Sequence, residues 1–214
     1  SGLLRLKNSA AVSGIYPPGP GANQFVDLSF DNTGKLWVAT GRDISGKGLY
    51  TFDGDTWGSI TTATHPVLVT NAYFNVTSVS EKIYAGNWGS GFLRIDGTGN
   101  YQIFNANNTP MRGISINPEY LVIAGIKSDS RGNLWVLNHD ASNRKILNVL
   151  TPDSTWHQFA NYTDSSLAQY MSLLIDRNDT KWFITVDPAR SGLYFFNENR
   201  TFGTTSDDKS GYAS

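Results

Sequence analysis

The chain has 214 residues, and 17 Lys and Arg against 18 Asp and Glu give it a formal net charge of −1. This balance excludes a strongly basic nucleic-acid binder and an acidic tail protein, and no apolar run approaches the ~18 residues that a membrane span needs. The absence of cysteine excludes disulfides, a thiol nucleophile and thiolate metal sites. Aromatic residues make up 13%, charged residues only 16%, and 21 residues are glycine. That composition is typical of an all-β protein with many tight turns.

A short strand with an aromatic residue after a polar turn recurs four times along the chain. The aromatic residues that align are Trp37, Tyr84, Trp135 and Trp182, at steps of 47, 51 and 47 residues. An apolar strand is expected before each turn, at residues 25–30, 76–79, 123–126 and 171–175. A third strand is expected at residues 48–53, 91–96, 145–150 and 192–197. A weaker fourth strand follows at 57–60, 101–104 and 156–159, with 201–204 as a poor candidate in the last unit.

Each unit is therefore expected to be a four-stranded antiparallel sheet of about 47 residues. Repetition of such a sheet predicts a β-propeller, in which each sheet is one blade. The blades are expected at about residues 24–61, 74–105, 121–160 and 170–205, with a half blade at 2–20, all within one domain of residues 1–214. Because four blades would leave the half blade idle, the chain is expected to be part of a larger ring, or to cover its open edges with a second copy.

The recurring tryptophans invite comparison with an aromatic binding cage. A bulky aromatic residue repeated once per blade more often packs between neighbouring sheets. We therefore expect Trp37, Trp135 and Trp182 to be buried between blades.

The repeat resembles a known family at residues 31–57. There the pattern Asp-x-x-Gly-x-Leu-Trp-Val-Ala-Thr is followed by Gly-Leu-Tyr-x-Phe-Asp-Gly-x-x-Trp. It is similar to the two-component-regulator propeller repeat of hybrid sensor kinases in Bacteroidetes, and to surface propellers of type IX secretion. The second unit departs from the pattern, with Ser80-Glu81-Lys82 at its turn and Tyr84 in place of Trp. The resemblance implies a non-catalytic recognition or scaffold module at the cell surface or in the periplasm, and it specifies the fold more strongly than the function.

Binding residues are expected on the longer loops of the propeller. Loops between second and third strands emerge on the same side as the links between units, and this side carries most of the long polar segments. We call it the long-loop face. Its candidate binding residues are Arg42, Asp43, Lys47, Trp88, His139, Asp140, Arg144, Asp187 and Arg190. Such residues could hold an anionic sugar, a peptide or a protein partner, with Trp88 as a stacking surface. The alternative is a set of solvated loop charges with local ion pairs.

The sequence predicts no metal site, no cofactor and no catalytic residues. The three histidines, His65, His139 and His157, lack the spacing of a metal motif. The segment 129–136 resembles the repeat of streptogramin lyases, which supports a lyase-like enzyme as the alternative function. That activity needs a histidine and a glutamate on neighbouring blades, and only His139 matches this requirement.

Overall fold

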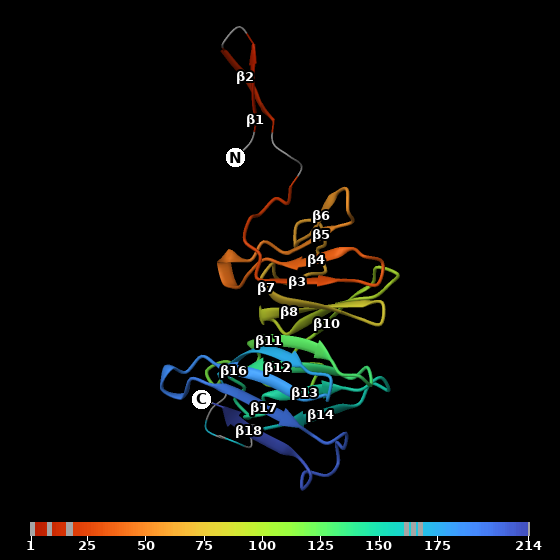
Figure 1. Ribbon diagram of the computed structural model, residues 1–214, viewed down its shortest axis with the longest axis vertical. Helices are drawn as coiled ribbons and strands as arrows, with labels where there is room; N and C mark the ends of the chain where they lie inside the picture. Colours follow the sequence, from red (N-terminus) through yellow and green to blue (C-terminus); the bar gives the residue numbers. More distant parts are fainter. Residues whose placement is uncertain are drawn as a thin grey trace.

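The computed structural model describes residues 3–7, 10–15, 19–160, 163, 166 and 169–213. Its strands form four consecutive four-stranded antiparallel units, preceded by a separate hairpin (Figure 1). The first sheet contains β3 (Asp27–Phe30), β4 (Leu36–Ala39), β5 (Leu49–Phe52) and β6 (Trp57–Ile60). The second contains β7 (Tyr73–Val79), β8 (Lys82–Gly89), β9 (Phe92–Ile95) and β10 (Tyr101–Phe104).

The other two sheets repeat this order. The third contains β11 (Leu121–Ser128), β12 (Leu134–His139), β13 (Leu147–Leu150) and β14 (Trp156–Phe159). The fourth contains β15 (Tyr170–Ile175), β16 (Lys181–Thr185), β17 (Leu193–Asn197) and β18 (Lys209–Ala213). The hairpin pairs β1 (Leu3–Lys7) with β2 (Ala10–Ile15) at the N-terminal side of the four sheets.

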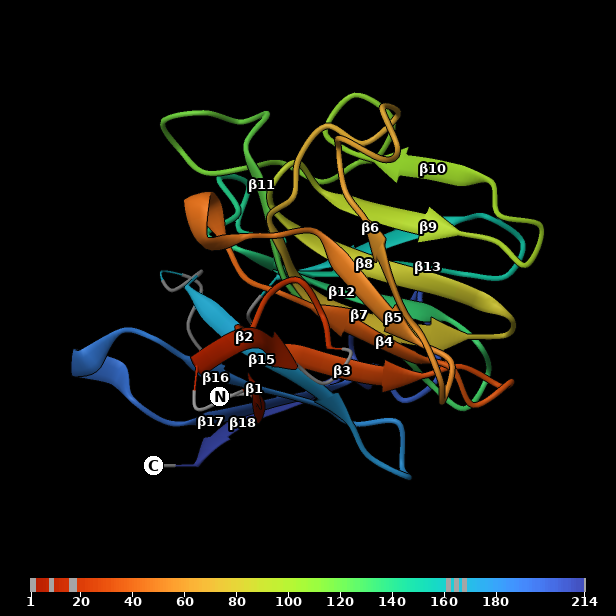
Figure 2. The same cartoon turned by 90° about the horizontal axis from the view of Figure 1, so that it is seen from above.

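The sheets stack face to face and are turned relative to one another, as Figure 2 shows from above. The first strand of each sheet contacts the first strand of the next, from β3 to β7, β11 and β15. The strands that carry the repeated aromatic residues are second in every sheet. This arrangement confirms the predicted all-β architecture and the register of its repeats.

The outer strand of the last sheet differs from the expectation. Residues 201–204 form no strand, and the fourth strand is β18, at residues 209–213, which pairs along the whole of β17. The hydroxyl of Thr201 bonds to the carbonyl of Glu198 and to the carboxylate of Asp207, so the chain turns here instead of extending. The last sheet therefore reaches beyond the expected range of 170–205.

One aspartate organises the turn before each repeated tryptophan. In the third sheet, Asp129 Oδ1 accepts the backbone N–H groups of Arg131 and Asn133, and its Oδ2 accepts the indole N–H of Trp135 at 2.9 Å. The same indole bond joins Asp31 to Trp37 at 2.9 Å and Asp176 to Trp182 at 3.0 Å. The Asp-to-Trp spacing in the sequence thus serves both the turn and the orientation of the ring.

Packing between neighbouring sheets forms three hydrophobic clusters. Trp135 is 0% exposed and Trp37 is 8% exposed, so the prediction of buried rings is confirmed for both. For Trp182 it is wrong, because this ring is only half-buried. Its neighbours Lys181 and Phe183 point toward the third sheet, and strand alternation therefore turns Trp182 to the outer face of the last sheet.

None of the helices in the described part of the chain has the length and apolar character needed to cross a bilayer.

Candidate functional site

The long-loop face is the edge of the stack where second strands are joined to third strands. Two short 3-10 helices, η1 (Asp43–Ser45) and η2 (Pro188–Arg190), lie on it, at the left in Figure 1. The nine residues predicted for this face fall into two groups and two single side chains.

The first group joins residues from three sheets. The guanidinium carbon of Arg42 lies 4.8 Å from the centre of the Trp88 ring. The centre of the His139 ring is 5.8 Å from the same indole, and Phe74 meets it edge-on at 5.2 Å. Trp88 is therefore already in contact with Arg42 and His139, and it is not a bare stacking surface. Arg42 is exposed, so its side chain is accessible to a ligand.

The strand register explains why Trp88 and His139 meet. Trp88 belongs to β8 and His139 is the last residue of β12, so neither lies in a loop. Both pair with Val122 of β11, one from each side. Because His139 Nδ1 donates to the carbonyl oxygen of Tyr170 at 3.0 Å, its ring is also tied to the fourth sheet.

Tyr120 is a site residue that the sequence did not predict. Its hydroxyl donates to Asp43 Oδ1 at 3.3 Å and links the loop of the first sheet to the segment before β11. Burial, followed by the nearby Asp43 carboxylate, raises the pKa of Tyr120. Phe74 was missed as well. The available signal was its position next to the buried Tyr73, at the start of an inner strand.

The second group surrounds Ser166. Arg144 Nη1 donates to the backbone carbonyl of Ser166 at 3.0 Å, and Arg190 Nη1 donates to its hydroxyl at 2.8 Å. Asp187 caps η2 through the N–H of Ala189 and lies 3.9 Å from the Arg190 guanidinium. Both arginines are exposed on this face.

Lys47 and Asp140 join neither group. Within the described ranges, neither side chain makes a hydrogen bond or ion pair, so both fit the alternative of solvated loop charges. In the same part of the chain, no three His, Cys, Asp or Glu side chains lie close enough together to hold a metal ion.

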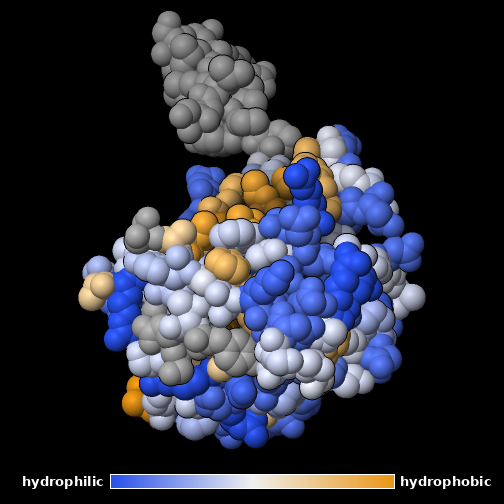
Figure 3. Space-filling view, turned by 60° about the horizontal axis from the view of Figure 1, so that its bottom comes forward, coloured by the Kyte–Doolittle hydropathy of each residue, from blue (hydrophilic) through white to orange (hydrophobic). Residues whose placement is uncertain are grey.

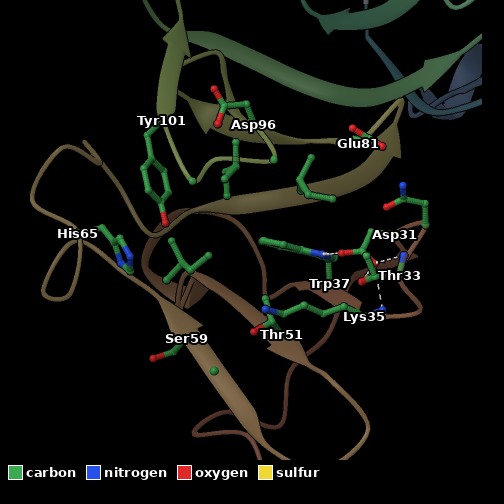
Figure 4. Close-up of a pocket in the computed structure, with 17 residues that line it drawn as sticks. Asp31, Thr33, Lys35, Trp37, Thr51, Ser59, His65, Glu81, Asp96 and Tyr101 are labelled. Carbon is green, nitrogen blue, oxygen red and sulfur yellow. Dashed lines mark hydrogen bonds between the residues drawn. The ribbon is translucent and has the colours of Figure 1, made fainter.

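A groove of about 590 Å³ opens elsewhere, between the first and second sheets (Figure 4). Trp37 and Thr51 lie on its floor, with Tyr101 and His65 toward one end and Asp31 and Glu81 toward the other. The rings of His65 and Tyr101 are 5.1 Å apart. Burial raises the pKa of Asp31, but hydrogen bonds from Thr33, Trp37 and backbone N–H groups outweigh it and hold this pKa below its usual value.

Solved structures with the same arrangement of sheets identify the fold. PorZ, an essential surface component of the type IX secretion system of Porphyromonas gingivalis, superposes with a TM-score of 0.78 over 95% of this chain, at 23% identity. The fold is a β-propeller. The extracellular domain of a putative hybrid two-component system protein from B. thetaiotaomicron gives a TM-score of 0.63 over 93% of the chain, at 17% identity.

Enzymes share this propeller arrangement at lower similarity. Virginiamycin B lyase from Staphylococcus aureus, solved as an inactive variant, gives a TM-score of 0.59 over 87% of this chain, at 14% identity. The chain spans 29% of PorZ, 23% of the B. thetaiotaomicron domain and 55% of the lyase. No family model and no curated relative matches the sequence. The predicted resemblance to surface and sensor propellers is therefore confirmed at the level of the fold.

Proposed function

We propose that the chain is a non-catalytic recognition part of an extracytoplasmic β-propeller, and that it binds its ligand on the long-loop face. Two similar structures support this location, because PorZ is a surface component and the B. thetaiotaomicron neighbour is an extracellular domain. The ligand is a glycan, a peptide or a protein segment that carries carboxylates.

The observation that carries the proposal is the cluster in which Arg42 and His139 both contact the Trp88 ring. An indole under a guanidinium fixes the plane of the cation and leaves its N–H groups at the edge free to bind a carboxylate in a bidentate manner. Arg42 comes from a loop of the first sheet, Trp88 from the second sheet and His139 from the third, so the cluster exists only when those sheets are assembled. Arg144 and Arg190 form a second cationic point on the same face.

The test is a titration with N-acetylneuraminic acid, oligogalacturonate and a Glu-rich peptide, with glucose as the neutral control. We expect saturable binding of at least one acidic probe, and a loss of about tenfold in affinity for Arg42→Ala, as for one charge-assisted pair. Arg177→Ala is the matched control, because Arg177 is an exposed arginine in the turn of the last sheet on the opposite face. Equal affinities for the two variants, or equal binding of glucose, would contradict the proposal.

A lyase-like activity is the alternative. Its structural support is the likeness to streptogramin lyases, and its residue support is His139. Against it, Nδ1 of His139 is bonded to the Tyr170 carbonyl and the ring lies beside Trp88. Incubation with quinupristin, followed by mass spectrometry, tests this directly. Turnover by the protein that disappears in His139→Ala would favour the enzyme.

We also infer that the outer faces of the first and last sheets are covered in the intact assembly, by further blades of a larger propeller or by a second copy. Asp27 and Ser29 bond to the second sheet, so strand alternation points Leu28 and Phe30 outward. Their exposed fractions are 56% and 68%. In the last sheet, Leu174 is 65% exposed. The space-filling view in Figure 3 shows an apolar area, coloured orange, on one side of the molecule.

Light scattering across a range of protein concentrations distinguishes the two occupants. Reversible dimers that Phe30→Ser weakens would identify a second copy. A monomer that binds the hydrophobic dye ANS, and loses that binding in Phe30→Ser with Leu174→Ser, would favour further blades. A monomer without dye binding would contradict both occupants.

A further inference from the structure

The spaces on either side of the two central sheets are equivalent positions in the repeat. We call the space between the first and second sheets the first gap, and that between the third and fourth sheets the last gap. The repeated tryptophans, Trp37 and Trp135, lie on the floors of the first and last gap respectively. Strand registers fix the equivalence, because Ile83 pairs with Ile95 in the second sheet as Lys181 pairs with Phe196 in the fourth.

Beside its hydrophobic cluster, the last gap holds charged side chains that pair with one another. Lys181 Nζ lies 3.8 Å from the centre of the Trp135 ring and bonds to Glu198. Arg131 donates to the same carboxylate at 2.7 Å. Arg200 completes the set by pairing with Asp179 at 3.4 Å. Its three cations are Arg131, Lys181 and Arg200, and its three carboxylates are Asp129, Asp179 and Glu198.

The first gap keeps most of these carboxylates and has lost all three cations. The residues equivalent to the three cations are Thr33, Ile83 and Gly99. The residues equivalent to the three carboxylates are Asp31, Glu81 and Gly97. Backbone conformation supports this match, because Glu81 and Asp179 have nearly the same positive φ, 64° and 61°. Two carboxylates therefore remain where the last gap holds a neutral ion-pair network.

Smaller side chains also explain why the first gap is open. Gly58 stands where His157 stacks on Phe202 in the last gap, and Gly97 stands where Glu198 lies. The result is the groove of about 590 Å³. Asp96 adds a third carboxylate to its lining, whereas Lys35, with its ammonium 5.6 Å from the Trp37 ring, is the lysine that lines it. With His65 neutral, these four groups give the groove a formal charge of −2.

We propose that the first gap binds a basic peptide segment, whose lysine or arginine side chain enters the groove and supplies the cation that Lys181 supplies in the last gap. The aliphatic stem of such a side chain would lie along Ile83, Ile95 and Tyr101, and its charged end would face Asp31 and Glu81 (Figure 4). Asp31 can bind this cation although it already accepts hydrogen bonds from its own turn and from Trp37. The equivalent Asp129 accepts the same backbone and indole N–H bonds and still lies 3.7 Å from the Arg131 guanidinium.

The protein itself provides the test, because Ile83→Lys places an ammonium where Lys181 stands in the last gap. Gly99→Arg adds the equivalent of Arg200, at an exposed turn where Arg200 itself adopts a positive φ. Glu81→Gln removes one carboxylate. Glu119→Gln is the matched control, since Glu119 is an exposed glutamate outside the groove. Circular dichroism checks the fold of each variant, and Gly99→Arg keeps the test valid if Ile83→Lys does not fold.

The probes are capped Gly-Lys-Gly and Gly-Arg-Gly peptides and the Nε-acetylated form of the first. Binding is followed through the Trp37 indole signal in ¹H–¹⁵N spectra, which Trp37→Phe identifies. We expect saturable shifts with about millimolar affinity for the two cationic peptides, the scale of a few partly exposed charge pairs. The acetylated peptide should cause no saturable shift. Affinity should fall about fivefold in Glu81→Gln and at least about tenfold in Ile83→Lys and Gly99→Arg.

Glu119→Gln and Arg42→Ala should bind the cationic peptides as the unmodified protein does. The second of these separates this groove from the long-loop face, so either proposal can fail without the other. The inference is overturned if the acetylated peptide binds equally well, if neither cationic peptide shifts the Trp37 signal, or if the two added cations leave the affinity unchanged.

Discussion

The first and last gaps share the same arrangement of backbone, but different side chains lie in them. In both, an aspartate in the turn holds the indole N–H of a tryptophan at 2.9 Å. In the last gap the ring is sealed by Lys181 and Phe202, whereas in the first gap Trp37 forms the floor of an open groove. The repeat therefore specifies the sheet and the position of its tryptophan. Whether the space above the tryptophan is core or binding site depends on a few side chains on the neighbouring sheet.

Replacing Trp37 or Trp135 singly should produce the largest difference in stability between the two gaps. Trp135→Ala should lower the free energy of unfolding by about 3–5 kcal/mol, the cost of deleting a large buried ring. Trp37→Ala should cost about 1 kcal/mol less, because one side of its ring borders the groove and loses fewer contacts. Denaturant unfolding monitored by circular dichroism measures both values. Equal losses would mean that the groove is closed in solution.

Disruption of the buried ion pair between Lys181 and Glu198 should produce the next largest loss of stability. Lys181→Met leaves the Glu198 carboxylate buried with Arg131 as its remaining partner, and should cost about 3 kcal/mol. The double variant Lys181→Met with Glu198→Met should recover most of this loss, because no buried charge is left without a partner. The same denaturant unfolding experiments apply. A double variant as unstable as the single one would show that the pair contributes mainly through its packing.

Transfer of the ion pair into the first gap tests whether the two gaps share the same backbone geometry. Ile83→Lys alone buries a cation, and Gly97→Glu alone adds a carboxylate where a new Cβ has its nearest neighbour at 3.7 Å. Together they should show a favourable coupling of about 1 kcal/mol or more in a double-mutant cycle of unfolding free energies. A coupling near zero would mean that the two gaps differ in backbone as well as in side chains.

Acidification should produce the smallest loss of stability for each aspartate that becomes protonated. Hydrogen bonds hold the pKa values of Asp31, Asp176 and Asp179 below the usual value of 3.8. The unfolded chain therefore binds protons more readily than the folded chain, and stability falls as the pH decreases through about 4. The free energy of unfolding should be constant between pH 5 and 7 and lower at pH 3. Asp176→Asn should reduce that decrease, whereas the exposed turn variant Asn32→Ser, which adds and removes no titratable group, should not.

The sheets were predictable because their signals are local. Trp135 follows Asp129 at a fixed distance, and this spacing reports a hydrogen bond within one turn. The outer strand β18 was missed because it lies beyond an extended loop, and its pairing with β17 is not apparent from a weakly apolar sequence. Trp182 was assigned to the core because the repeat pattern does not show that its ring lies on the face of the last sheet turned away from the third sheet.

The sites were less predictable because they depend on relations between repeats. Trp88 and His139 were predicted as separate loop residues, and only the pairing of both with Val122 brings them together. Lys181 resembles any exposed lysine in the sequence, although it is 0% exposed. The signal for the groove was present in the aligned repeats, where Gly58 aligns with His157 and Gly97 aligns with Glu198. Interpreting it required knowledge of which sheets are neighbours.

The double pairing of Val122 also has a consequence for dynamics. The start of β11 is hydrogen-bonded to β12 on one side and to the end of β8 on the other. The second and third sheets are therefore joined through their backbones, and they should open as one cooperative unit. Amide hydrogen exchange should be slowest in this central pair of sheets, and the outer sheets should exchange through smaller, independent openings.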